Sequence, residues 1–197
     1  KNSAACTEYD MDMGLYLSHW DIHDDSYGYY DENGNATTED NDYLDYNEYY
    51  NNQLKEILGN DDYGNDGHFV EVWMDGAKGS GSDAQEYDFE LWYDTIQSYE
   101  GEAAGYEADC MLFGAGAYTT VRWIGNENGY ADKNTWSKSI VDYETNSIDS
   151  NDTGSYTVGY EDGNQWTVPE ADARITCGWV WGTTKNTTKR ISELAAI

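Results

Sequence analysis

The sequence predicts an α/β fold in which strands and helices alternate along the chain. Two observations favour it: short apolar runs of strand length, and segments in which apolar side chains recur every three or four residues. Their order is strand, helix, strand, helix, strand, which is typical of βαβ units that build a parallel sheet. No proline-rich linker or internal repeat divides the chain, so we expect one domain.

The predicted strands are three apolar runs. They cover Gly14–Ser18, His68–Met74 and Asp109–Phe113. The second run ends at an Asp-Gly pair and the third at Gly114, and both are common chain-turning signals.

Helical spacing appears in two segments between these strands, Tyr43–Leu58 and Phe89–Tyr99. The polar stretch Asp24–Asp42 is long enough to form a functional loop. Beyond Val121 the pattern loosens, and we expect only short elements there. They are strand candidates at Ser155–Tyr160 and Ala173–Thr176, and a final helix that starts near Thr188.

The charge of the chain restricts its partners. The 197 residues include 39 Asp and Glu but only 10 Lys and Arg, which gives a net charge of −29. Nucleic acids and anionic membrane surfaces attract basic patches, so this balance argues against both. An aromatic content of 15% indicates a folded core rather than disorder, and no apolar run is long enough to span a membrane.

Cysteine and histidine do not indicate a metal or cofactor. Cys6, Cys110 and Cys177 are widely spaced and match no metal-binding pattern, so buried thiols are favoured, with one disulfide left open. His19 and His23 could share a metal only on a helix, and the sequence there reads as the end of a strand.

Three segments combine Trp with ionisable side chains at predicted strand ends: Tyr16–His23, Trp73–Gly76 and Val121–Glu127. Functional groups gather at the carboxyl ends of strands in βα folds. Two carboxylates, Asp75 and Glu127, beside aromatic rings match the needs of glycoside hydrolysis, because one can donate a proton while the other stays ionised. The residues alone leave open that Asp75 only belongs to a turn and that Glu127 is only a surface acid.

Four segments, taken in order, resemble the catalytic domain of α-L-fucosidases of glycoside hydrolase family 29. They are Gly14–Asp21, Asn47–Leu58, Val72–Ala77 and Val121–Glu127, and Gly178-Trp179 followed by Ile191–Leu194 resembles the family as well. The resemblance covers the chain outside Asp24–Asp42 and Tyr143–Asn164. It implies a (β/α)8 TIM-barrel-type catalytic domain, of which residues 1–197 supply the middle strands and one later strand but lack the N-terminal strands and the last strand.

The resemblance also implies the chemistry, which is retaining hydrolysis of terminal α-L-fucosides without a cofactor. Asp75 matches the nucleophile of the Trp-x-Asp-Gly motif. Glu127 matches the general acid/base of a Gly-Asn-Glu motif in members that prefer α-1,3/1,4-linked fucose, as in Lewis-type glycans. The positions implied to line the fucose subsite are Tyr16, Trp20, His23, Trp73, Arg122 and Trp179.

The first motif departs from the family pattern Tyr-Leu-Ser-Pro-Trp-Asp-Arg, since His19 stands for the Pro and Ile22 for the Arg. We expect these changes to alter the loop backbone and to remove a charged contact, and thus to change the local substrate contacts. The partner implied is a fucosylated oligosaccharide or glycoconjugate, and that substrate class suggests an extracellular or cell-surface location. Two alternatives stay open: a carbohydrate-binding module without catalysis, and an inactive fucosidase remnant.

Overall fold

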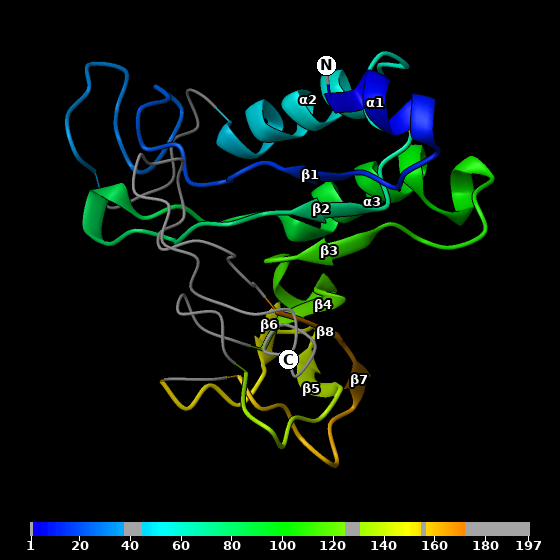
Figure 1. Cartoon of the computed structure of the whole chain (residues 1–197). Coiled ribbons are helices and arrows are strands. Elements are labelled where there is room, and N and C mark those ends of the chain that lie inside the picture. Colours follow the sequence, from blue (N-terminus) through cyan, green and yellow to red (C-terminus); the bar gives the residue numbers. More distant parts are fainter. Residues whose placement is uncertain (1, 38–44, 125–130, 155–156, 172–197) are drawn as a thin grey trace, which may run out of the picture. The chain divides into compact units, whose positions relative to one another are not determined.

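The computed structural model describes residues 2–37, 45–124, 131–154 and 157–171 (Figure 1). The chain divides into two compact units, Lys1–Tyr118 and Thr119–Ile197, which we describe separately as unit 1 and unit 2. No helix among the described residues is both long and apolar enough to cross a membrane.

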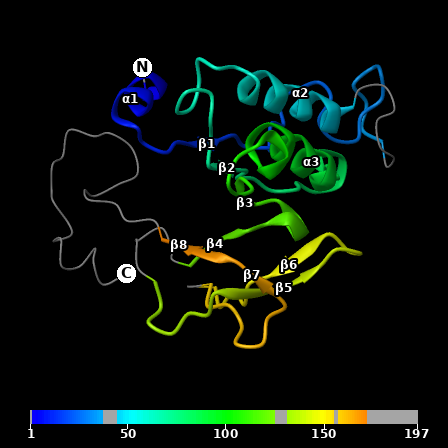
Figure 2. The same cartoon turned by 90° about the vertical axis from the view of Figure 1, so that its right-hand side faces the viewer.

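Unit 1 contains the predicted βαβαβ arrangement. Its parallel sheet has the order β1-β2-β3, and α2 and α3 pack together on one side of it (Figure 2). The strands and helices of unit 1 are α1 (Asn2–Tyr9), β1 (Gly14–Tyr16), α2 (Tyr46–Leu58), β2 (Glu71–Trp73), α3 (Phe89–Glu100) and β3 (Met111–Phe113). The prediction of a parallel sheet with intervening helices is therefore confirmed for this part of the chain.

The two long helices of unit 1 begin at aspartate caps. The Asp45 carboxylate accepts the backbone N–H of Glu48 at 3.1 Å at the start of α2. Asp88 accepts the N–H of Leu91 at 3.0 Å at the start of α3. Each cap satisfies an N–H that has no partner within its helix, and such a cap stabilises a helix by about 1 kcal/mol.

The core of unit 1 lies between the helices and the sheet. Val72 and Leu112 come from neighbouring strands and are fully buried, and Leu54, Trp92 and Ile96 meet them from α2 and α3. Apolar side chains at intervals of three and four residues on the helices produce this contact. The periodicity that predicted the helices thus also identified their buried faces.

The described residues of unit 2 form two small sheets. β4 (Val121–Trp123) pairs in parallel with β8 (Val168–Glu170). The antiparallel sheet β6-β5-β7 combines Ser147–Asp149, Lys138–Asp142 and Gln165–Trp166. We did not predict β5, although buried Ser139 and Val141 alternate with exposed neighbours as in a half-buried strand.

The strand predicted at Ser155–Tyr160 is wrong for its described residues, 157–160. Gly159 adopts a left-handed φ of 68°, which interrupts an extended strand, and its N–H bonds to the Ser150 carbonyl at 2.9 Å. The elements predicted at Ala173–Thr176 and near Thr188 lie outside the described residues. The described strands form open sheets and no closed barrel.

Candidate active site

Asp75 lies two residues after the end of β2, at the carboxyl edge of the parallel sheet of unit 1, and is exposed. The hydroxyl of Tyr16, the last residue of β1, donates to Asp75 Oδ2 at 2.6 Å. This hydrogen bond raises the pKa of Tyr16 to about 12, with burial and the charge of Asp75 adding to the effect. The phenol therefore stays protonated, and able to donate, at neutral pH.

The chain after β1 also holds the backbone of Asp75. Ser18 Oγ donates to the Asp75 carbonyl at 2.6 Å and accepts the Trp20 N–H at 3.2 Å. A Cβ on Gly76 would lie 2.8 Å from the Trp20 Cβ, which is closer than real Cβ contacts allow. The Asp-Gly pair is therefore more than a turn signal, because glycine lets the two loops touch.

The other predicted subsite residues of unit 1 lie in different surroundings. Trp20 is 46% exposed, and His23 is also exposed. Trp73 stacks on Phe113 with ring centroids 3.8 Å apart and ring planes 17° from parallel. The structure therefore brings Tyr16, Trp20 and Asp75 together through hydrogen bonds and packing, whereas a side chain of β3 covers one face of Trp73.

His19 lies in the core beneath this edge and is only 4% exposed. Its ring meets those of Tyr50, Tyr87 and Phe89 edge to face, with the shortest centroid distance, 4.4 Å, to Tyr87. Burial lowers the pKa of His19 to about 4, although the nearby negative charge of Asp75 acts in the opposite direction. A neutral imidazole thus occupies the position where the family motif has Pro.

Arg122, on β4 of unit 2, is 2% exposed and donates to the backbone carbonyls of Trp136 and Thr157. Burial lowers the pKa of its guanidinium. These bonds tie two loop segments of unit 2 to β4. A substrate contact by Arg122 stays a prediction, as do the roles of Glu127 and Trp179, which lie outside the described residues.

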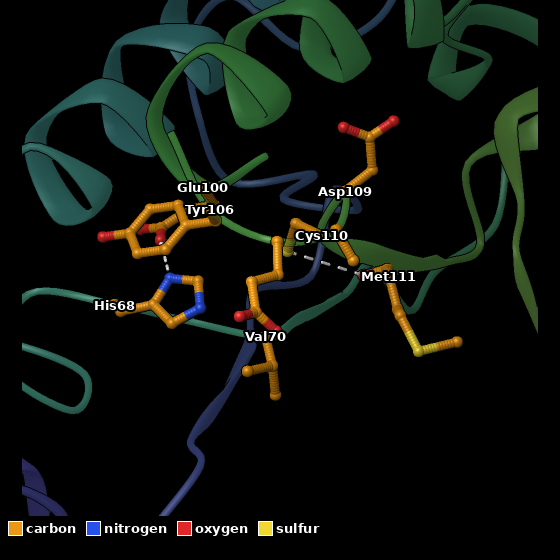
Figure 3. A pocket seen from close by; sticks show the side chains of 9 residues that line it. His68, Val70, Glu100, Tyr106, Asp109, Cys110 and Met111 are labelled. Carbon is orange, nitrogen blue, oxygen red and sulfur yellow. Dashed lines mark hydrogen bonds and ion pairs between the residues drawn. The ribbon is translucent and has the colours of Figure 1, made fainter. Parts of the chain in front are cut away.

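A concave site lies at the opposite, amino-terminal edge of the sheet of unit 1. It is a pocket of about 370 Å³ (Figure 3). Its lining residues are His68, Val70, Glu100, Tyr106, Glu107, Ala108, Asp109, Cys110 and Met111. Among the described residues, no group of three or more His, Cys, Asp or Glu is placed to hold a metal ion.

A buried carboxylate anchors this pocket. Glu100 Oε2 accepts the Phe69 N–H at 3.0 Å and pairs with His68 Nδ1 at 2.7 Å, and the Tyr106 ring stacks on the imidazole at 3.7 Å. Burial raises the pKa of Glu100, while these two hydrogen bonds oppose the shift. Sequence reasoning missed this residue, although Glu100 follows buried Ile96 by one helical turn on α3.

The pocket also contains a cysteine thiol. Cys110 is buried and free, which agrees with the sequence prediction, and burial raises its pKa. Cys6 is free and half-buried, and Cys177 lies outside the described residues.

Comparison with known proteins links the chain to one group of enzymes. No family model matches it. It is 35% identical over 182 residues to alpha-L-fucosidase 1 of Arabidopsis thaliana. The aligned region covers 91% of this chain and 30% of the Arabidopsis protein.

The solved structures to which the chain is similar include fucosidases as well. A Ruminococcus gnavus GH29 fucosidase in complex with fucose is 72% identical to this chain and superposes on it with a TM-score of 0.86. The aligned region covers 98% of this chain and 38% of the fucosidase chain. SpGH29 is 38% identical to this chain, with a TM-score of 0.72. The aligned region covers 98% of this chain and 38% of the SpGH29 chain.

The chain thus spans about a third of the length of the proteins it matches. Its homologues are named α-L-fucosidases, and both the sequence relatives and the solved structures support its resemblance to glycoside hydrolase family 29.

Proposed function

We propose that the chain forms part of the catalytic domain of a retaining α-L-fucosidase of glycoside hydrolase family 29, with Asp75 as the nucleophile. One observation carries the proposal: an exposed carboxylate at the carboxyl edge of a parallel sheet, hydrogen-bonded to Tyr16 and followed by Gly76, which packs against Trp20. The fucose bound to the Ruminococcus gnavus relative supports the choice of sugar. Trp20 offers an exposed ring on which the apolar face of a sugar can stack.

The proposed reaction is a double displacement between Asp75 and Glu127. Asp75 attacks the anomeric carbon while protonated Glu127 gives its proton to the leaving oxygen, so the glycosidic bond breaks and a fucosyl ester forms. Glu127 then takes a proton from water, whose oxygen attacks the same carbon. Fucose and the Asp75 carboxylate are released, and Glu127 is protonated again.

Two finer assignments belong to this proposal. A retaining mechanism requires the two carboxyl groups to lie roughly 5–5.5 Å apart. The resemblance of the Gly-Asn-Glu motif at Glu127 to that of certain family members implies α-1,3/1,4-linked fucose in Lewis-type glycans as the substrate. Such glycans suggest an extracellular or cell-surface location.

Of the two alternatives, a carbohydrate-binding module without catalysis fits less well. Such modules are usually β-sandwiches, whereas α2 and α3 supply much of the core of unit 1. An inactive remnant differs from the proposed enzyme only in turnover, so kinetics decide between them.

The test is hydrolysis by the full-length protein and, separately, by residues 1–197. Each is given an aryl α-L-fucoside and Lewis-type trisaccharides, and the first anomer released is identified by proton NMR. We expect the full-length protein to release α-L-fucose from both. Absence of turnover in the full-length protein would overturn the proposed activity, and initial release of β-L-fucose would overturn the retaining mechanism.

A further inference from the structure

We propose that Ser18 is a positioning residue for Asp75, an inference that rests on the proposed function. Its hydroxyl lies between the proposed nucleophile and the proposed sugar platform: it donates to the Asp75 carbonyl and accepts the Trp20 N–H. No resemblance or sequence pattern assigned a role to this side chain.

The first support is the hydrogen-bond pattern between β1 and β2. The Leu17 N–H donates to the Trp73 carbonyl at 3.0 Å and continues the ladder past the end of β1. Two residues further along, the Asp75 carbonyl receives the Ser18 hydroxyl instead of a backbone N–H. The side chain therefore extends the connection between the strands to the residue that carries the proposed chemistry.

The second support is that Asp75 is held at two separate points. Ser18 holds its main chain, and the Tyr16 hydroxyl holds its side chain through Oδ2. Because the Tyr16 hydrogen bond to Oδ2 limits rotation of the carboxylate, it also limits where Oδ1, the proposed attacking oxygen, can lie. Fixing both the main chain and one carboxylate oxygen restricts where Oδ1 can lie, and displacement of a reacting group by about 1 Å can slow a reaction roughly hundredfold.

The third support is the close contact of Trp20 with Gly76. Because one Ser18 oxygen bonds to the backbone of both Trp20 and Asp75, it holds together the two segments that carry the stacking ring and the nucleophile. Ser18 is exposed at this edge, so its two hydrogen bonds contribute more to local geometry than to the stability of the core.

The experiment measures kcat and KM of the full-length protein for an aryl α-L-fucoside. Ser18→Ala should lower kcat about ten- to a hundredfold, because the carboxylate is misplaced in the transition state, and should leave KM within about threefold. Ser18→Thr keeps the hydroxyl and should recover kcat to within about threefold, whereas Ser18→Val, of the same shape without the hydroxyl, should not. The matched control is Ser98→Ala, which removes an exposed serine hydroxyl bonded to the Thr95 carbonyl at 2.7 Å on α3.

The outcomes separate the inference from the function. An active wild type whose kcat is unchanged in Ser18→Ala overturns the positioning role alone. Equal kcat values in the Thr and Val variants do the same, and this pair decides the matter if Ser18→Ala folds poorly. An inactive wild type overturns the proposed function, and the inference with it.

Discussion

The two edges of the parallel sheet in unit 1 each hold a carboxylate in hydrogen bonds, but in opposite surroundings. At the carboxyl edge, Asp75 is exposed and receives the Tyr16 hydroxyl. At the amino edge, Glu100 is fully buried and receives the Phe69 N–H and the His68 ring. The same functional group is open to ligands in one place and enclosed in the other.

The contrast suggests that the carboxylate at one edge serves the proposed reaction and the carboxylate at the other edge stabilises the fold. An exposed carboxylate can reach a substrate, whereas burial raises the pKa of Glu100, whose hydrogen bonds organise the backbone around it. We therefore expect substitutions at the carboxyl edge to affect turnover more than stability, and substitutions at the amino edge to do the reverse.

The largest effect is expected for Asp75→Asn in the full-length protein. Loss of the proposed nucleophile should lower kcat for fucosides more than about a thousandfold, while fucose binding and the Tm stay close to wild type. Enzyme kinetics and calorimetric titration with fucose measure this. Asp94→Asn, at an exposed position on α3, is the control, and turnover near wild type in Asp75→Asn would remove Asp75 from the mechanism.

At the amino edge, Glu100→Ala should lower the free energy of unfolding by about 3 kcal/mol, because it leaves the buried Phe69 N–H without its acceptor and the His68 ring without its partner. Denaturant unfolding measures the loss, and the folded fraction should retain wild-type kcat. Glu56→Ala, at an exposed position on α2, should change the free energy by less than about 0.5 kcal/mol. If Glu100→Ala instead lowered kcat without a loss of stability, the contrast between the edges would fail.

His19 tests whether the support beneath the carboxyl edge is sensitive to acid. Its pKa is lowered to about 4 in the fold, so the unfolded chain binds its proton first as the pH falls. The wild type should therefore lose about 3 kcal/mol of stability, relative to His19→Phe, between pH 6.5 and pH 4. Unfolding across this range measures the difference, with His23→Gln as the exposed control, and parallel curves for wild type and His19→Phe would contradict it.

The smallest effect is expected for Tyr16→Phe, which removes only the hydroxyl that holds Asp75 Oδ2. We expect kcat to fall about tenfold with little change in Tm, because one hydrogen bond to an exposed charged group is lost. Tyr63→Phe, at an exposed position in a loop, provides the control. A fall in KM and kcat together would show that the bond strains the free carboxylate instead of aligning it.

Much of unit 1 could be predicted because its apolar spacing is regular. The core contacts of Leu54 and Ile96 follow from intervals of three and four residues, and the edge position of Asp75 follows from the strand before it. α1 was missed because it has no buried residue and hence no apolar periodicity.

The contacts within the site could not be predicted. Ser18 bonds to a carbonyl 57 residues away along the chain, and Glu100 to an N–H 31 residues away. The spacing of apolar residues within one strand or helix does not predict contacts between residues so far apart in the sequence. The contact of Ser18 with Asp75 depends on the parallel register that pairs Tyr16 with Trp73, and this register is known only from the folded structure. Glu127 and Trp179 remain predictions that rest on the family resemblance.

The close approach of Gly76 to Trp20 has a consequence for how this protein can diverge. A side chain at position 76 would collide with the Trp20 Cβ, so a change there requires the Trp20 loop to move first. The two positions are therefore epistatic: the order in which mutations arrive matters, and single substitutions at position 76 that leave the Trp20 loop unchanged are closed. Directed evolution of this site should vary both loops in one library.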